Sequence, residues 1–300
     1  MAEPAFRVHR IANTETHRAH SVQCLNDEGV VITLASTTDG DDYGFAVCGQ
    51  AGDGWTIRNV VAMPEPRVRG INGAGQFAGW SSRGGRERAL LGRVDPLEHE
   101  IRKGHAGLTG IDAAGRCIGF RLAKGELTSF LQDGARVIDL EPPPVLSASG
   151  YLAKSIGAGR ILGEGDLSEI LVWDLAGKLT GRIERDMGEL VGGAEAGPIV
   201  CKYGFIADGK PAWCPCAPRC SDFEARGVNA SGWVVGLGRA LDRDTQAHAC
   251  LWRGGESFNL NDLVDAPGVH LREADAINDG GWVACTDGEG EPVILEPVRG

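Results

Sequence analysis

The sequence contains no long apolar run. Nowhere do 18 apolar residues follow one another, and the opening stretch MAEPAFRVHRIANTETHRAH lacks the apolar segment of a secretory signal. These absences argue against a spanning helix and a signal peptide. We therefore expect a cytoplasmic protein that has no membrane partner, and the odd number of scattered cysteines, 9 in all, fits a reducing compartment.

Basic residues and familiar catalytic motifs are scarce as well. Lys and Arg total 30 against 41 Asp and Glu, which gives a formal net charge of -11. Because affinity for nucleic acids comes mainly from clustered Lys and Arg, we expect no nucleic-acid partner. The sequence also lacks a Gly-rich phosphate loop, a Gly-x-Ser-x-Gly elbow and a zincin helix, which removes the commonest enzyme classes.

Glycine, by contrast, is abundant, with 45 residues, and much of it closes a recurring turn. The sharpest copy is GVNASGWVVG at residues 227–236. Asn tolerates a left-handed φ and Gly takes the positive-φ position that closes a hairpin, so this turn joins two antiparallel strands. Equivalent turns begin at Asn26, Asn72, Asp112 and Asn278, and degenerate copies lie around residues 157 and 194.

The spacing of these turns predicts the fold. A period of about 40 residues with four short strands per unit is typical of propeller blades, and the 3.6-residue apolar spacing of helical repeats is absent. We expect an all-β, seven-bladed β-propeller of four-stranded antiparallel blades, closed by residues 6–11 pairing into the last blade. It is predicted to be monomeric and to form a single domain over residues 1–300, with blades at about 21–65, 66–106, 107–146, 147–187, 188–222, 223–269 and 270–300.

One unit carries a family resemblance. Residues 227–236 and the segment HACLW at 248–252 resemble the HAF repeat, a bacterial family whose units read roughly I-N-x-x-G-x-V-V-G and then H-A-F-L-W. Cys250 stands in place of Phe, and other units keep the turn without the His. The resemblance implies a propeller and a bacterial protein. The family is generally labelled extracellular and has no assigned function, so it supplies no catalytic residues.

A polar position recurs three residues before each turn residue. The positions two and four before are small or apolar, so strand alternation places the polar side chains on one face, around the mouth of the central channel. This ring consists of Gln23, Arg69, Thr109, Lys154, Val191, Arg226 and Asp275. Two residues nearer the entrance, we expect a second level that consists of Ser21, Arg67, Gly107, Leu152, Glu189, Glu224 and Glu273.

Two interpretations of these charges are open. Buried charges need a partner, water or a ligand, so the ring either neutralises itself or binds something. In the second case Arg69, Lys154 and Arg226 hold a carboxylate or phosphate, since Arg suits bidentate contact, and the acids recognise an amine. The predicted function is then the binding of a small anionic or zwitterionic ligand or of a peptide end.

Histidines offer an enzymatic alternative. His20 precedes the first inner strand and His270 the seventh, and ring closure makes these units neighbours. With Glu273 and Asp275 they would form a general acid and base or a His-carboxylate metal site. The protein would then be a small cytoplasmic lyase, cyclase, isomerase or hydrolase. Solvated loop histidines, such as His105, are the other interpretation.

A cysteine cluster suggests a structural metal. If a turn follows the strand that contains Cys201, that residue lies opposite the segment 214–220, which holds three further cysteines. Four thiolates would bind zinc tetrahedrally and staple a unit whose repeat has decayed. A disulfide and unmodified thiols are the alternatives. The residues concerned are Cys201, Cys214, Cys216 and Cys220.

Overall fold

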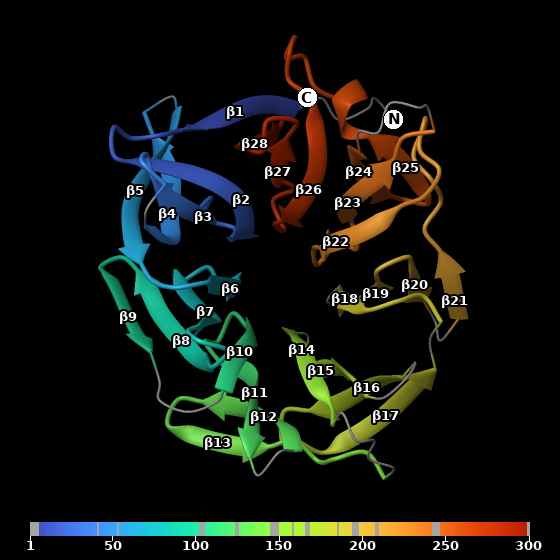
Figure 1. The fold of residues 1–300 in the computed structure, drawn as a ribbon. Helices are drawn as coiled ribbons and strands as arrows, with labels where there is room; N and C mark the ends of the chain where they lie inside the picture. Colours follow the sequence, from blue (N-terminus) through green and yellow to red (C-terminus); the bar gives the residue numbers. More distant parts are fainter. Residues whose placement is uncertain are drawn as a thin grey trace.

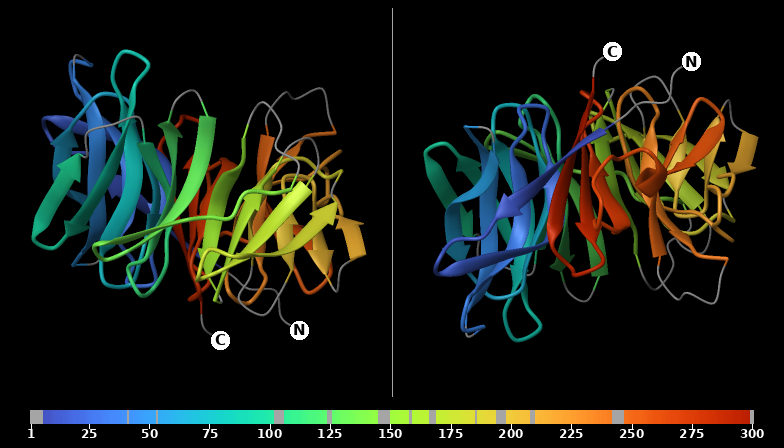
Figure 2. Two further views of the ribbon diagram at one scale, coloured as in Figure 1. Left: turned by 90° about the horizontal axis from the view of Figure 1, so that it is seen from below. Right: turned by 90° about the horizontal axis from the view of Figure 1, so that it is seen from above.

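Six β-sheets stand around a central axis in the computed structural model, which is an all-β propeller (Figure 1). Seen from the side, the sheets form a flat ring (Figure 2). The structure describes residues 6–298, apart from 41, 53, 102–105, 124–125, 145–149, 158, 166–168, 185, 194–197, 208–209 and 242–246. Within these residues the one helix is the 3-10 turn η1 (Leu260–Asp262), and no helix is long and apolar enough to cross a bilayer.

Five of these sheets have four antiparallel strands each, with the first strand nearest the axis. They are β6 (Pro66–Ile71), β7 (Gln76–Ser82), β8 (Glu87–Val94), β9 (Leu97–Ile101); β10 (Ala106–Ile111), β11 (Cys117–Ala123), β12 (Glu126–Asp133), β13 (Arg136–Asp139); β14 (Leu152–Gly157), β15 (Arg160–Glu164), β16 (Glu169–Asp174), β17 (Leu179–Glu184); β18 (Leu190–Gly193), β19 (Ile199–Cys201), β20 (Gly204–Ala207), β21 (Lys210–Trp213); β22 (Glu224–Val228), β23 (Val234–Arg239), β24 (Ala247–Arg253), β25 (Glu256–Asn259).

The sixth sheet has eight strands, so the prediction of seven four-stranded blades is wrong. Its N-terminal strand pairs on both edges: antiparallel with the last strand, Phe6 opposite Pro297, and parallel with β5, where Ile11 lies opposite Trp55. This double pairing merges the segments predicted as first and last blades. The strand order is β2 (His17–Leu25), β3 (Val31–Thr37), β4 (Tyr43–Ala51), β5 (Gly54–Ala62), β1 (Phe6–Ala12), β28 (Pro292–Pro297), β27 (Val283–Asp287), β26 (Leu271–Ile277).

The recurring Asn residues link neighbouring turns around the ring. Asn278 accepts a hydrogen bond from the Trp282 amide at 2.8 Å within its own turn, and its Nδ2 donates to the Asn26 carbonyl at 2.9 Å in the next turn. This relay accounts for the Asn in the repeat, because an amide side chain carries its acceptor and its donor on two separate atoms. The same donation joins Asn229 to Asn278, Asn26 to Asn72 and Asn72 to Asp112.

Replacing Asn278 with Ala is expected to lower the free energy of unfolding by about 2 kcal/mol, because a buried amide and a buried carbonyl lose their partners. Urea denaturation measures the change. Glu28→Ala, at an exposed position of an equivalent turn, is the matched control and should shift stability by less than ~0.5 kcal/mol. Equal effects of the two substitutions would contradict a structural role for the relay.

Apolar side chains fill the spaces between sheets. One cluster joins Val235 and Leu251 of β23 and β24 to Leu271 and Val283 of β26 and β27. The eight-stranded sheet has its own cluster, in which Ile11 packs with residues of β2, β3, β4, β5, β27 and β28. Burial of this apolar surface stabilises the ring and fixes the positions of the inner strands, which carry the predicted site.

Candidate functional site

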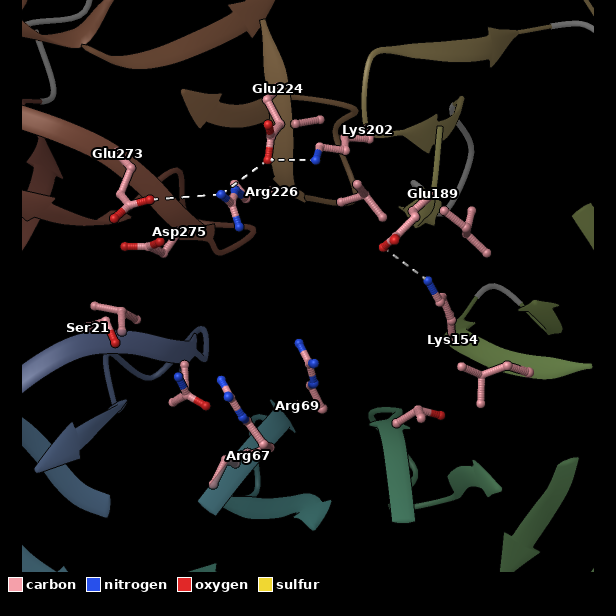
Figure 3. A pocket seen from close by; sticks show the side chains of 18 of the residues that line it. Ser21, Arg67, Arg69, Lys154, Glu189, Lys202, Glu224, Arg226, Glu273 and Asp275 are labelled. Atoms are coloured by element: carbon pink, nitrogen blue, oxygen red, sulfur yellow. Dashed lines mark ion pairs between the residues drawn. The ribbon is translucent and has the colours of Figure 1, made fainter. Parts of the chain in front are cut away.

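A pocket of about 590 Å³ opens where the innermost strands begin. This volume lies in the range common for small-ligand sites. Each of the seven inner strands, β2, β6, β10, β14, β18, β22 and β26, contributes residues to its wall. Figure 3 shows charged side chains from several of these strands facing one another across the pocket.

The structure brings the predicted ring together at this pocket. All of the ring residues line it, namely Gln23, Arg69, Thr109, Lys154, Val191, Arg226 and Asp275. Six of the seven residues of the predicted second level line it as well, namely Ser21, Arg67, Leu152, Glu189, Glu224 and Glu273, whereas Gly107 does not. Two further lining residues were not predicted, Trp80 on β7 and Lys202 after β19. The alternation pattern was applied to the inner strands, and neither residue lies on one of them.

Each ring residue lies at an irregularity in strand pairing. On β6, Val68 pairs with Gly79 and Gly70 with Ala78, so Arg69 is passed over. The other inner strands repeat the shift, passing over Gln23, Thr109, Lys154, Val191, Arg226 and Asp275. A bulge of this kind turns a side chain away from the regular pleat, and here it accompanies every side chain of the ring. Turn spacing alone does not reveal it.

Two of the ring cations have carboxylate partners. The Arg226 guanidinium lies 3.1 Å from Glu224 and 4.0 Å from Glu273. The Lys154 ammonium lies 2.5 Å from Glu164. These pairs agree with the interpretation in which pocket charges neutralise one another, and Thr109 is likewise engaged, since its hydroxyl donates to the Ala153 carbonyl at 2.6 Å.

Arg67 and Arg69 differ from these cations. Within the described residues neither forms an ion pair, and the Arg69 guanidinium instead lies 4.8 Å from the centre of the Trp80 ring. Partial burial and the neighbouring Arg67 charge lower the pKa of Arg69, against a weaker opposing effect of Glu189. Since Arg remains protonated in proteins, the pocket holds two adjacent positive charges that an anion would stabilise.

Asp275 is the corresponding unpaired acid. Burial raises its pKa from 3.8 to about 7, although the Thr286 hydroxyl donates to it at 2.7 Å and favours the charged form. The nearby Glu273 charge raises the pKa further, while Arg226 and Arg272 lower it. Among the described residues no cation forms an ion pair with Asp275. An ammonium group entering the pocket would therefore favour its ionised form.

The Asp275 pKa predicts a pH effect on stability. The folded state retains a proton that the unfolded state releases near pH 4, so stability is highest below that pH and is lost as pH rises toward 7. We expect Asp275→Asn to remove this part of the pH dependence. Urea denaturation of both proteins at pH 5 and pH 8 measures the free energy of unfolding. If its change between the two pH values were the same in the variant as in the wild type, the assignment would be contradicted.

The predicted histidine site is not assembled. The His20 ring bonds to the Ser36 hydroxyl at 2.7 Å, and the His270 ring lies 3.1 Å from the Ala247 carbonyl and packs edge-on against His248. Neither lines the pocket, whereas Glu273 and Asp275 do. The structure therefore does not place these histidines with the two carboxylates, because each ring has a partner in its own surroundings. His105 lies outside the described residues.

The four cysteines of the predicted zinc site do not come together as one group, although Cys214 and Cys220 share an apolar cluster. Cys216 is exposed and its thiol donates to the Ser221 carbonyl at 3.2 Å, whereas Cys220 is buried with its sulfur 3.9 Å from that of Cys250. Burial raises the pKa of Cys214 to about 12, so its thiol stays protonated. Across the described residues, which include Cys201, no group of three His, Cys, Asp or Glu is placed to hold a metal ion.

Comparisons with known proteins bear on the fold. No family model and no curated protein matches the chain, so the HAF-repeat resemblance stays a prediction. The chain is similar to the structure of YCF48 bound to D1 peptide, at 10% identity and a TM-score of 0.51 over 100% of this chain and 97% of that one. It also matches the β-propeller domain of the Trilobed protease from Pyrococcus furiosus, at 12% identity and a TM-score of 0.40 over 94% and 86%.

Proposed function

We propose that the pocket binds a compact ligand through its carboxylate or phosphate, either a small zwitterion or the end of a peptide. The observation that carries this proposal is the Arg67 and Arg69 pair, which faces the pocket without an ion pair among the described residues. Both residues are exposed in the pocket, and their like charges repel each other. A bound anion would relieve this repulsion, and Arg favours planar, bidentate oxyanions.

The acidic residues of β26 support a zwitterionic ligand. Figure 3 shows Glu273 and Asp275 on the wall of the same pocket as Arg67 and Arg69, with Ser21 of β2 between the two groups. Burial raises the pKa of Asp275 to about 7, and an ammonium group beside it would stabilise its ionised form. One ligand with both charges satisfies the unpaired residues of both groups, which a simple anion does not.

A peptide is one ligand of this class. The similar YCF48 structure is bound to a D1 peptide, which is a precedent for peptide binding by a chain of similar fold. A pocket of about 590 Å³ suits two or three residues at a chain end better than an extended segment. Binding, rather than turnover, is the function that the geometry favours, because the two histidines proposed for catalysis do not line the pocket.

A ligand-selection experiment tests the proposal. A mixed-sequence tripeptide pool, prepared as free acids and as carboxamides, is equilibrated with the protein, and retained peptides are identified by mass spectrometry. We expect free acids to be retained at least about tenfold more than their amides, because amidation removes the charge-assisted bonds to arginine. Equal retention of the two pools, or retention of neither, would overturn the proposal.

A further inference from the structure

A second cavity lies beside the pocket. Its volume is about 790 Å³, and it is formed between the eight-stranded sheet and the β6–β9 sheet. Strands alternate in direction, so the β3–β4 turn, the β5–β6 connection and the β7–β8 turn all reach the face on which the pocket opens. The lining is mostly apolar, with Leu34, Tyr43, Ala62, Met63, Pro64 and Pro66.

Arg67 joins this apolar groove to the pocket. It lines both, and it is one of the two arginines of the pocket that form no ion pair among the described residues. A ligand whose carboxylate reaches Arg67 therefore has an apolar surface directly beside its charged end. The groove otherwise holds few charges, Asp42, Glu65 and Arg83, so it suits an apolar group better than a second charged one.

The groove is held in shape by its own backbone contacts. The Met63 amide donates to the Tyr43 carbonyl at 3.1 Å, which ties the β5–β6 connection to the eight-stranded sheet. The Ser81 hydroxyl donates to the Pro64 carbonyl at 2.6 Å, which ties it to β7. Between two prolines, Glu65 has a φ of +41°, a value uncommon for a residue other than glycine. Such conformations persist where surrounding contacts enforce them, often beside binding sites.

Tyr43 supplies an exposed aromatic wall. It is 65% exposed, and its backbone is fixed by pairing with Ser36 and by the Met63 contact. A large aromatic side chain on a rigid backbone provides contact area at low entropic cost when a ligand covers it. An apolar group of a ligand would cover this exposed ring.

We infer that the groove is a specificity subsite for an apolar side chain within the last two residues of a peptide whose free carboxylate is held by Arg67 and Arg69. The inference rests on the proposed function and narrows it to peptides with an apolar carboxyl end. Arg67 sets the register, since the carboxylate and the apolar side chain lie on its two sides. The exposed residues Tyr43, Ala62 and Pro64 then provide the surface against which the side chain is buried.

Titration calorimetry with two tripeptides tests this assignment. Gly-Phe-Phe is expected to bind the wild-type protein at least about tenfold more tightly than Gly-Gly-Gly, the gain that burial of one large apolar side chain provides. Tyr43→Ala should weaken Gly-Phe-Phe at least about fivefold and leave Gly-Gly-Gly within about twofold. Val137→Ala, at an exposed apolar position on β13, is the matched control and should change neither affinity.

The outcomes separate the two proposals. Equal affinity for both peptides, or a Tyr43→Ala variant that weakens both alike, would overturn the subsite and leave the carboxylate site standing. Failure of both peptides to bind would overturn the carboxylate site and the subsite together. Since Tyr43 is largely exposed, its replacement should not perturb folding, and an unchanged melting temperature verifies this.

Discussion

Replacing Arg69 with methionine is expected to weaken binding of a free-acid tripeptide roughly 10- to 100-fold, the loss typical for hydrogen bonds to a charged group. Methionine retains length and packs favourably against Trp80, so the substitution removes charge with little loss of contact. Calorimetric titration with Gly-Phe-Phe measures the change. Amidated Gly-Phe-Phe should bind both proteins with similar, weak affinity, because it lacks the carboxylate that Arg69 recognises.

Arg226→Met is the matched control on the opposite wall. Arg226 already pairs with Glu224 at 3.1 Å, so its replacement should reduce affinity by less than about threefold. The stability of the two variants should also differ. Loss of Arg69 relieves its repulsion with Arg67, so the unliganded Arg69→Met protein should melt no lower than wild type. A larger affinity loss for Arg226→Met than for Arg69→Met would contradict the assignment of the anion site.

Deleting residues 1–12 is expected to destabilise the protein by several kcal/mol, or to prevent folding, because it removes β1 from the middle of the eight-stranded sheet. Phe6 and Ile11 leave the apolar clusters of that sheet. Asp287, whose side chain is 2% exposed, loses the Arg10 guanidinium 3.1 Å away. An unpaired buried carboxylate adds its own cost. Thermal unfolding followed by circular dichroism measures the effect.

A point variant in the same strand controls for the deletion. Arg7 has a side chain that is 67% exposed and lies 3.5 Å from Glu296, so Arg7→Ala should cost less than ~1 kcal/mol. A deleted protein that melts within a few degrees of wild type would show that β1 does not close the ring. It would also mean that β5 and β28 tolerate exposed edges.

Much of this architecture was predictable from the sequence because its repeat has a physical cause. Each Asn closes a turn and bonds to the next, so the constraint recurs at the period of the sheets. The side chains three residues before each turn were therefore placed correctly around one pocket. The copies at Asp112 and around residues 157 and 194 are weaker, and there the relay stops: Asp112 accepts from its own turn but cannot donate onward.

Other features depended on contacts between segments far apart in sequence. The fusion of the predicted first and last blades depends on the short parallel pairing of Ile11 and Ala12 with β5, which no local pattern signals. The His20 ring turns to Ser36, a partner 16 residues away, rather than toward the acids. Cys220 lies beside Cys250 on β24. The zinc prediction considered only the cysteines within residues 201–220, so it did not include this neighbour.

The pairing shifts of the inner strands separate recognition from architecture. A residue passed over by its neighbouring strand has no cross-strand counterpart to match, so its identity is little constrained by the sheet. Arg, Lys, Asp, Gln, Thr and Val all occupy this position in a single chain. A lineage built on this scaffold would therefore be free to exchange these residues one by one, and so acquire new ligands while the ring itself stays the same.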